Sequence, residues 1–220
     1  MDVVNYSFIF PANNKTVVRN FTKNIKGKFP DSEVVAVYKS NSFFDAWRKG
    51  LQRVKNEIII LTHQDVEFQQ IPDLRRYFKG NVGMLGVVGT KEITLSNPWW
   101  FDINRLYNGK LSGEVTHWGL SDPYEVTDYG DYGDVVVLDG VCLITRREVL
   151  YKVGIPKFKW CKWDYYDHII SLEFIKAGYR LKTVPIKLVH LSKGGGGENM
   201  EKTQKYFVKK YFKKKEKWSV

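Results

Sequence analysis

Polar residues directly follow an apolar run in the first half of the chain. The run Ile58–Leu61 ends in Thr62, and His63, Gln64 and Asp65 come next. An apolar run bounded by polar residues is typical of a strand buried on both faces, as in a parallel sheet. Ligands of open parallel sheets bind beyond the carboxyl ends of the strands. We therefore expect a site at Asp65, the alternative being that this acid only begins a loop or caps a helix.

The elements before and after this segment alternate between strand and helix patterns. Three short apolar runs are expected to be strands, and the residues between them have apolar side chains at helical spacing. A short helix is expected between the third run and a fourth. This β-α-β-α-β order implies right-handed crossovers and a parallel sheet, so the predicted fold class is α/β. The predicted strands cover residues 6–10, 34–37, 58–61 and 84–89, and the first two helices cover 17–27 and about 43–54. Ser42 is expected to cap the second helix, with Asp45 three residues on as in a capping box.

The second half of the chain is less regular. Residues 91–134 are rich in Gly, Asn, Asp, Trp and Tyr and lack clear periodicity, which predicts a functional insertion or a poorly ordered loop. Periodic patterns then return, and four consecutive glycines precede a lysine-rich end. The expected strands are 135–138, 141–144, 181–184 and 186–190, the expected helices begin near 146 and span 164–177, and the flexible loop is 194–197.

The composition limits the possible classes of protein. The 220 residues are 43% hydrophobic and 15% aromatic, which excludes intrinsic disorder and a small disulfide scaffold. Cys142 and Cys161 are too few for a disulfide framework, and Cys142 is expected to be a buried apolar residue. The first residues lack the pattern of a secretory signal, and no apolar stretch approaches the roughly 20 residues of a spanning helix. These features predict a cytoplasmic protein.

The net charge of +11 calls for an anionic partner or surface. Residues 201–217 hold eight lysines and two glutamates, so this segment carries most of the excess. Its aromatic residues repeat at helical spacing, so a helix there could pack its aromatic side on the domain or lie at an anionic membrane. Nucleic-acid binding is not expected, because the charge is confined to one terminal segment and no nucleic-acid motif is present.

Several motifs follow one another in a fixed order along the chain. They are FIFPANN, EIIILTHQDVEF, GVVGT, LDGVCLITRREVL and YYDHIISLEFIKAGYRLKTVPIKLVHLSKGG. Together they resemble the nucleotide-sugar-dependent glycosyltransferases of family 2, in particular the short glycosyltransferase-like branch, over about residues 6–197. The resemblance implies a GT-A fold, a Rossmann-like, mixed, mainly parallel sheet flanked by helices. We expect this domain at 1–198 and a lysine-rich helix or tail at 199–220.

The resemblance also implies a divalent metal, Mn²⁺ or Mg²⁺, beside the diphosphate of the donor. In the family, a D-x-D motif follows the third strand; its first residue favours the ribose and its last binds the metal. Here Asp65 keeps the metal position, whereas His63 replaces the first acid and Gln64 lies between them. His190 is expected near the metal or the diphosphate, and imidazole suits manganese better than magnesium. Lys193 could meet a phosphate as a point charge.

Two acids are expected to act on the sugar and the acceptor. An inverting transfer needs a general base for the acceptor hydroxyl, and Asp167 aligns with the acid that the family places at the start of a helix. Asp164, one turn earlier, could compete for this role, and both could simply favour the positive end of the helix. Ile169 stands where many relatives carry a second acid. By resemblance, Asp139 matches an acid of the sugar and acceptor pocket, and Gly140 is expected to let the substrate approach.

The remaining expectations concern the nucleoside and the sugar. Pro11, Asn13 and Asn14 follow the first strand and are expected to contact the nucleoside. Arg48 stands where an asparagine is common and could bind a phosphate or a carboxylate. The candidate platforms for sugar stacking are Trp99, Trp100, Trp118 and Trp163.

The predicted function is inverting, metal-dependent transfer of a sugar from a nucleotide diphosphate sugar to an acceptor hydroxyl. The acceptor is expected to be a glycan, a lipid-linked molecule or a protein. Two alternatives stay open. The incomplete D-x-D motif and Ile169 are compatible with a domain that binds a nucleotide sugar without turning it over. The basic tail is compatible with a protein that binds polyanions, including nucleic acid. If the protein is a glycosyltransferase, we expect it to be cytoplasmic and to contact a membrane peripherally through the tail.

Overall fold

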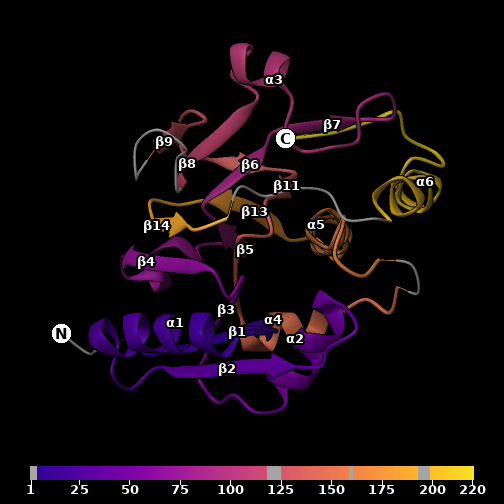
Figure 1. Cartoon of the computed structure of the whole chain (residues 1–220). Coiled ribbons are helices and arrows are strands. Elements are labelled where there is room, and N and C mark those ends of the chain that lie inside the picture. The colour runs from indigo at the N-terminus through magenta and orange to yellow at the C-terminus, as the bar shows by residue number, and fades with distance from the viewer. Residues whose placement is uncertain (1–3, 118–124, 159–160, 193–198) are drawn as a thin grey trace.

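The computed structural model of the chain describes residues 4–117, 125–158, 161–192 and 199–220 (Figure 1). The helices are α1 (Lys15–Lys28), α2 (Phe43–Leu51), the 3₁₀ helix η1 (Leu74–Tyr77), α3 (Ile103–Tyr107), α4 (Arg147–Val153), α5 (Tyr166–Lys176) and α6 (Met200–Tyr211). The strands are β1 (Tyr6–Ala12), β2 (Glu33–Tyr38), β3 (Ile58–Thr62), β4 (Val66–Gln70), β5 (Val82–Gly86), β6 (Val88–Thr90), β7 (Glu92–Thr94), β8 (Leu111–His117), β9 (Glu125–Asp128), β10 (Asp134–Val135), β11 (Val137–Leu138), β12 (Cys142–Arg146), β13 (Arg180–Thr183), β14 (Lys187–His190) and β15 (Lys217–Ser219).

A seven-stranded mixed sheet runs through the molecule in the order β10-β13-β5-β12-β3-β1-β2. β1 pairs in parallel with both β2 and β3, as the sequence predicts. The next strand in the sheet is β12, which lies antiparallel between β3 and β5. The predicted α/β class with a mixed sheet is confirmed, and its antiparallel share exceeds the expectation because β12 separates β3 from β5.

The side chains of β1 alternate between two helices. Phe8 and Phe10 face Phe21 of α1, with ring centroids 5.9 and 4.5 Å apart. Ile9 points to the opposite face, where Gly50 of α2 leaves room for it. Burying each of these side chains stabilises the fold by roughly 1.5–3 kcal/mol. Because β2 and β3 flank β1 on opposite sides, the sheet has a topological switch point at the carboxyl ends of β1 and β3.

Side-chain caps fix where the first two helices begin. The Asn14 side chain accepts hydrogen bonds from two backbone N–H groups of the first turn of α1. The Ser42 hydroxyl accepts from the backbone N–H of Asp45, as expected for the start of α2. The Asp45 carboxylate accepts from the backbone N–H of Asn41, so the reciprocal bond reaches one residue beyond the capping-box position.

The segment after β3 differs from the prediction. A strand, β4, comes before the only helical turn there, the 3₁₀ helix η1. Val66 and Phe68 are buried whereas Glu67 and Gln69 are exposed, which is the period of two of a strand. The predicted fourth strand is likewise divided into β5 and β6, because β5 pairs with β12 and β13 whereas β6 pairs with β8 and β11.

A second sheet takes two strands, β8 and β9, from the region that lacked periodicity. Its order is β11-β6-β8-β14-β4, with β9 paired to β8. β14 runs antiparallel to β4 and parallel to β8, and this register places His190 beside both Val66 and His117. The backbone N–H of Leu191 donates to the carbonyl of Asp65 at 2.9 Å. The second sheet therefore brings the end of β14 to the end of β3.

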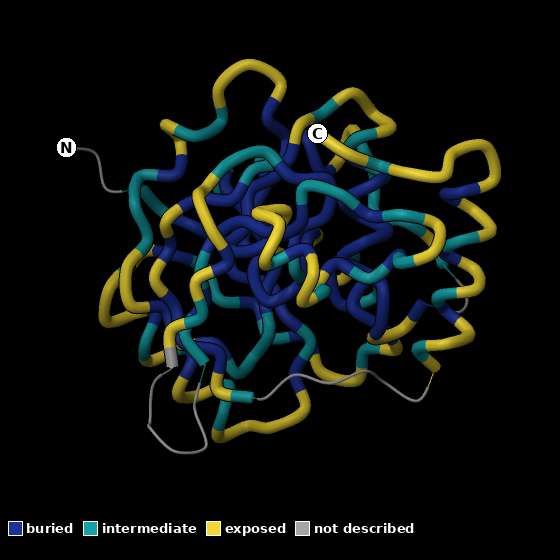
Figure 2. Tube along the Cα trace, turned by 90° about the horizontal axis from the view of Figure 1, so that it is seen from above, coloured by how far each residue is buried: buried dark blue, intermediate teal, exposed yellow. Residues whose placement is uncertain are grey.

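The C-terminal segment packs onto the main body of the protein. α6 lies beside α5, and β15 pairs with β7 (Figure 1). Phe207, Tyr211 and Phe212 are buried in the same hydrophobic core as the central sheet, which forms the buried interior in Figure 2. No helix in the described parts of the chain has the length and apolar character needed to cross a membrane.

Candidate active site

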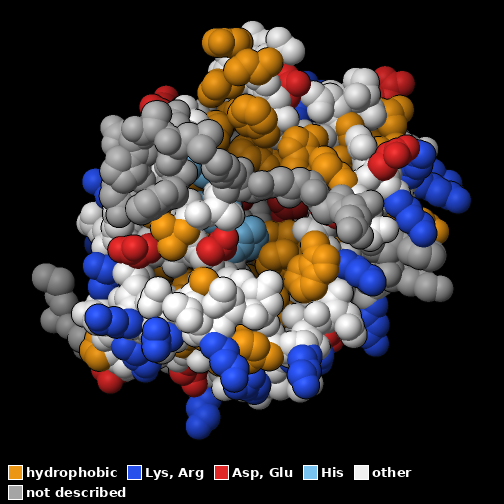
Figure 3. Space-filling model, viewed as in Figure 1, with side chains coloured by type: hydrophobic (Ala, Val, Ile, Leu, Met, Phe, Trp, Pro, Cys, Tyr) orange, Lys and Arg blue, Asp and Glu red, His pale blue; other side chains and the backbone are white. Residues whose placement is uncertain are grey.

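Two adjacent cavities open where β1, β3 and β14 end. The first, here called the switch-point cavity, has a volume of about 360 Å³. The second, the aromatic cavity, has a volume of about 490 Å³. His63, Phe43 and Trp163 line both cavities. Figure 3 shows histidine and acidic side chains near the middle of this face, with apolar side chains beside them.

The switch-point cavity is built from loops that follow the parallel strands. It is lined by Pro11 and Ala12 at the end of β1 and Asn13 after it, Lys39 and Ser40 after β2, His63, Gln64 and Asp65 after β3, and the aromatic residues Phe43 and Trp163. Gln64 holds two of these loops together. Its Oε1 accepts from the backbone N–H of Asn13 at 3.1 Å, and its Nε2 donates to the Asn13 side chain. The cavity thus lies at the place where open parallel sheets bind their ligands.

Three side chains at the boundary between the cavities form a group with metal-ligand spacing. His63 Nδ1 lies 3.3 Å from His190 Nε2, and Asp65 Oδ1 lies 3.9 and 3.8 Å from these two atoms. Ligand atoms at right angles on an ion with bonds of ~2.1 Å are about 3 Å apart. Small rotations of these side chains would therefore place all three atoms on one ion, so the group fits a divalent cation.

Burial favours the neutral form of both imidazoles in this group. Burial lowers the pKa of His63, although the charges of Asp65 and Asp167 oppose the shift. Burial, with a contribution from the neighbouring His63, lowers the pKa of His190 to about 4. A neutral imidazole offers a nitrogen lone pair to a metal, whereas an imidazolium does not. The donor set available at neutral pH is therefore two imidazoles and one carboxylate.

The aromatic cavity combines rings with carboxylates. The aromatic residues that line it are Phe43, Trp99, Trp100, Phe101, Tyr129, Trp163, Tyr165 and Tyr166, and the acids are Asp139, Asp164 and Asp167. Trp163 is 43% exposed, whereas Trp100 is 8% exposed. Trp99 stacks on His168 at 4.9 Å between ring centroids. Trp163 thus presents the most open ring among these tryptophans, and aromatic faces of this kind stack with sugar rings.

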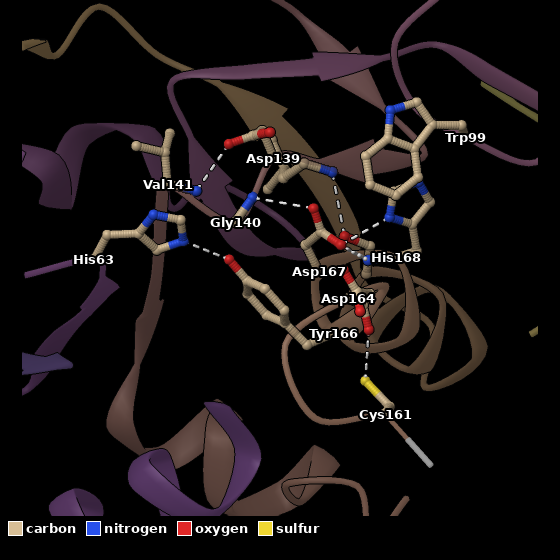
Figure 4. A network of polar contacts seen from close by, with 12 residues as sticks. His63, Trp99, Asp139, Gly140, Val141, Cys161, Asp164, Tyr166, Asp167 and His168 are labelled. Carbon is tan, nitrogen blue, oxygen red and sulfur yellow. Dashed lines mark hydrogen bonds and ion pairs between the residues drawn. The ribbon is translucent and has the colours of Figure 1, made fainter. Parts of the chain in front are cut away.

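Asp167 is held at the start of α5 by three hydrogen bonds (Figure 4). Its Oδ1 accepts from the backbone N–H of His168 at 2.8 Å and lies 2.7 Å from Nδ1 of the same residue. Its Oδ2 accepts from the backbone N–H of Gly140 at 3.2 Å. Burial alone would raise the pKa of Asp167, but the charge and hydrogen bonds of His168 and the bond from Gly140 lower it below its ordinary value.

Asp139 lies beside Asp167 with the opposite electrostatic outcome. Its Oδ1 accepts from the backbone N–H of Val141 at 2.8 Å. Burial and the negative charge of Asp167 raise the pKa of Asp139 to about 7. Two neighbouring carboxyl groups whose pKa values move apart can take different roles in proton transfer. Near neutral pH, Asp167 is ionised and Asp139 is partly protonated.

The structure brings together most of the residues that the sequence singled out. His63, Asp65 and His190 form one group, Asp139 and Asp167 form another, and the switch-point cavity contains the predicted nucleoside and D-x-D-like positions Pro11, Asn13 and Gln64. Asp65 lies just after the end of β3, where the parallel-sheet argument expects a site. Their catalytic and binding roles stay predictions.

Other predicted residues have structural partners or lie elsewhere. The Asn14 side chain caps α1 and does not line either cavity. Arg48 donates to the carbonyl of Pro156 at 2.9 Å and so ties α2 to the segment before α5. Lys193 and Trp118 lie outside the described residues. Gly140 was expected to let substrate approach, but the Tyr166 hydroxyl occupies the space beside its Cα.

Sequence reasoning missed three residues of the site. Tyr166 contacts His63, His168 contacts Asp167, and His117 lies beside His190 with ring centroids 5.8 Å apart. Tyr166 and His168 flank the predicted base, so their polar side chains in a buried helix start were the available signal. His117 ends a strand in the region that showed no periodicity, and its position follows only from the pairing of β8 with β14.

The fold is thus a mixed α/β sheet with a group of possible metal ligands at the end of β3, between two cavities. Residues 8–214 match the sequence pattern of the Glycosyltransferase like family, and the chain belongs to this family. No curated protein sequence matches the chain.

Solved structures of glycosyltransferases share the fold at low sequence identity. GalNAc-T7, solved with UDP, GalNAc and Mn²⁺, superposes with a TM-score of 0.62 at 11% identity, covering 97% of this chain and 49% of its own. The catalytic domain of Drosophila β1,4-galactosyltransferase 7, in complex with xylobiose, has a TM-score of 0.54 at 10% identity, covering 94% of this chain and 80% of its own. The mannosyltransferase PcManGT from Pyrobaculum calidifontis, in complex with GDP-Man and Mn²⁺, has a TM-score of 0.54 at 15% identity, covering 87% of this chain and 58% of its own. The chain spans about half the length of GalNAc-T7, and these similarities establish the fold.

Proposed function

We propose that the protein is a metal-dependent glycosyltransferase that moves a sugar from a nucleotide diphosphate sugar to an acceptor hydroxyl with inversion. The observation that carries this proposal is the group of His63, Asp65 and His190 at the boundary of the two cavities. One cavity lies at the switch point, where a nucleotide would bind, and the other contains carboxylates and aromatic rings suited to sugars. The leaving diphosphate would then meet the metal between them.

His63, Asp65 and His190 would hold the divalent ion. When bound, the ion would neutralise the charge that develops on the diphosphate leaving group. Two imidazoles and one carboxylate suit Mn²⁺, whereas Mg²⁺ prefers oxygen ligands, so Mn²⁺ is the proposed ion and Mg²⁺ the weaker alternative. Since the group carries a single negative charge, we expect modest affinity in the absence of the diphosphate.

The nucleoside would occupy the switch-point cavity. Pro11 and Asn13 line its β1 side, and Gln64 fixes the Asn13 loop through two hydrogen bonds. Lys39 lies on its β2 side, where its ammonium group could meet a phosphate. We retain Lys193 as a further phosphate contact on the basis of the family motif.

Asp167 is the proposed catalytic base. Its Oδ2 keeps a lone pair beyond the bond from Gly140, because each carboxylate oxygen can accept two hydrogen bonds. That oxygen would take the proton of the acceptor hydroxyl as the acceptor oxygen bonds to the anomeric carbon. The bond from this carbon to the diphosphate oxygen then breaks with its electron pair, and the nucleoside diphosphate leaves. Asp139, in its protonated form, would donate a hydrogen bond to a sugar oxygen and so orient the reacting groups.

The acceptor is proposed to be a glycan, free or linked to a lipid or protein, and a peripheral membrane contact would suit a lipid-linked one. The outer side of α6 supports such a contact, because Lys209 and Lys213 border an open groove with the exposed side chains of Leu95 and Tyr206. Each lysine near an anionic leaflet contributes roughly 1 kcal/mol. Lys210 pairs with Glu173 at 2.9 Å and is left out of this contact. We further propose that the protein is cytoplasmic.

The deciding experiment measures release of free nucleoside diphosphate from a panel of nucleotide sugars with Mn²⁺ and a set of sugar acceptors. Transfer that depends on Mn²⁺ and is lost in Asp65→Ala supports the proposal, and NMR of the product gives the anomeric configuration. A product with retained configuration contradicts the inverting mechanism and the role of Asp167. Nucleotide-sugar binding without release by any acceptor would favour the alternative of a binding domain.

A further inference from the structure

Tyr166 connects the two halves of the site. Its hydroxyl oxygen lies 2.6 Å from Nε2 of His63 (Figure 4). The other ring nitrogen, Nδ1, lies 3.3 Å from Nε2 of His190 and 3.9 Å from Oδ1 of Asp65. An imidazole that binds a metal through Nδ1 carries its proton on Nε2, and such ligands commonly donate that proton to a fixed acceptor. The Tyr166 oxygen is in the position of this acceptor.

The ring of Tyr166 is itself fixed by its neighbours. It stacks on Phe43 with centroids 3.8 Å apart and an interplanar angle of 20°, and Trp47 meets it edge-on at 5.6 Å. The residue before it, Tyr165, has a φ of 57°, a left-handed conformation that is uncommon for residues other than glycine. Such conformations persist where the surrounding structure holds them, and they cluster at functional sites.

The loop at Gly140 is shaped around this tyrosine. A methyl group at position 140 would overlap the hydroxyl and the outer ring atoms of Tyr166. The same residue donates its backbone N–H to Asp167. Gly140 therefore lies against both Tyr166 and Asp167. Tyr166 contacts His63 of the His63–Asp65–His190 group, and Asp167 is the neighbour of Asp139.

We propose that Tyr166 is a positioning residue for the metal: it holds His63 with Nδ1 toward Asp65 and His190, and residue 140 is glycine because the tyrosine needs that space. This inference rests on the proposed metal site and adds a residue to it. Tyr166 acts through His63 and does not itself bind the ion. Loss of its hydroxyl would leave His63 held only by its stacking on Phe43 and its contact with His190, and would remove the partner that keeps its proton on Nε2.

The test compares wild type with Tyr166→Phe and with a matched control, Tyr165→Phe. Tyr165 is adjacent and equally aromatic, and its buried hydroxyl has no hydrogen-bond partner among the described residues. Mn²⁺ binding is measured by electron paramagnetic resonance without any nucleotide, and the visible spectrum of Co²⁺ added to each protein reports the ligand set. Thermal unfolding without metal monitors the fold.

We expect Tyr166→Phe to weaken Mn²⁺ binding by about 10–100-fold, the usual effect of losing such a partner, and to alter the Co²⁺ spectrum. Tyr165→Phe should bind both ions like the wild type. Gly140→Ala should weaken Mn²⁺ binding like Tyr166→Phe, because it displaces the same hydroxyl. Equal affinity and equal spectra for wild type and Tyr166→Phe would overturn the inference and leave the metal site standing. Absence of Mn²⁺ and Co²⁺ binding by the wild type would overturn both.

Discussion

The separation of the pKa values of Asp139 and Asp167 makes a specific prediction about pH and rate. The pKa of Asp167 lies below its ordinary value, so this proposed base is ionised throughout the range from pH 5 to 8. Its titration therefore gives no fall in kcat/KM on the acid side of this range. The pKa of Asp139 is about 7, so its protonated fraction falls from about 90% at pH 6 to about 10% at pH 8. If protonated Asp139 donates a hydrogen bond in the transition state, kcat/KM should fall above pH 7.

The magnitudes follow from the roles of the two groups. Asp167→Asn keeps the shape and removes the base, so kcat should fall by about 10²–10⁴-fold at every pH while donor affinity barely changes. Asp139→Asn keeps an N–H donor at every pH, so the fall near pH 7 should disappear and the loss should be smaller, about tenfold. Initial rates of nucleoside diphosphate release from pH 5 to 9, with saturating Mn²⁺, measure both effects.

One outcome would refute the assignment. If kcat/KM of the wild type rises with unit slope up to pH 7, a group with the pKa of Asp139 must lose its proton before transfer. If Asp139→Asn is then also the variant that loses 10²–10⁴-fold, Asp139 is the base and Asp167 only keeps its pKa high. Near-normal rates for both variants would move the role to Asp164, which also lines the aromatic cavity.

The same pKa shift predicts how stability depends on pH. Since the folded-state pKa of Asp139 is about 7 and an unfolded aspartate titrates near ~3.9, the folded state binds more protons between these values. The free energy of unfolding should therefore fall as the pH rises from about 4 to 7. Asp139→Asn removes this dependence and should raise the melting temperature at pH 8 but not at pH 4, which differential scanning calorimetry measures. An equal effect at both pH values would contradict the shift.

Three further predictions concern the metal, the core and the tail. Asp65→Ala should abolish Mn²⁺ binding with an unchanged metal-free melting temperature, and wild-type Mn²⁺ affinity in this variant, by electron paramagnetic resonance, would remove Asp65 from the site. Phe207→Ala should cost about 3–5 kcal/mol in urea unfolding because the ring is fully buried against Tyr165, whereas a change at the exposed Tyr206 should cost far less, and equal costs would contradict the packing of α6. The double variant Lys209→Glu/Lys213→Glu should reduce sedimentation with anionic vesicles at low salt. A double Lys→Glu change on the exposed side of α1 is the control. Equal binding by the wild type and both variants would place the contact elsewhere.

The C-terminal segment shows why charge reversal tests the membrane contact better than truncation. Phe207 packs on His168 and Tyr165 with ring centroids 5.6 and 5.1 Å apart, Met200 lines the aromatic cavity, and Tyr211 donates a hydrogen bond to Glu173 at 2.6 Å. Removal of this segment would uncover the core beneath the proposed base. Surface charge changes leave these contacts in place.

The sequence by itself determined the order of the elements from β1 to β3 and the end of β3, where chemistry could occur. The strands β1, β2 and β3, the helices between them and the polar segment at Asp65 follow from apolar periodicity and capping residues. These signals are local, because each depends on side chains within a few residues of one another. The order of the motifs then pointed to the family that residues 8–214 match.

Only the tertiary structure decided how these residues combine. His63 joins a group of possible metal ligands because β4 turns back after Asp65 and pairs with β14, which carries His190 to within 3.3 Å across 127 positions of sequence. The opposite pKa shifts of Asp139 and Asp167 arise from burial and mutual charge, and the contact of Tyr166 with His63 needs the space at Gly140. Strand pairing and burial are properties of the whole fold, so no local pattern in the sequence could have specified them.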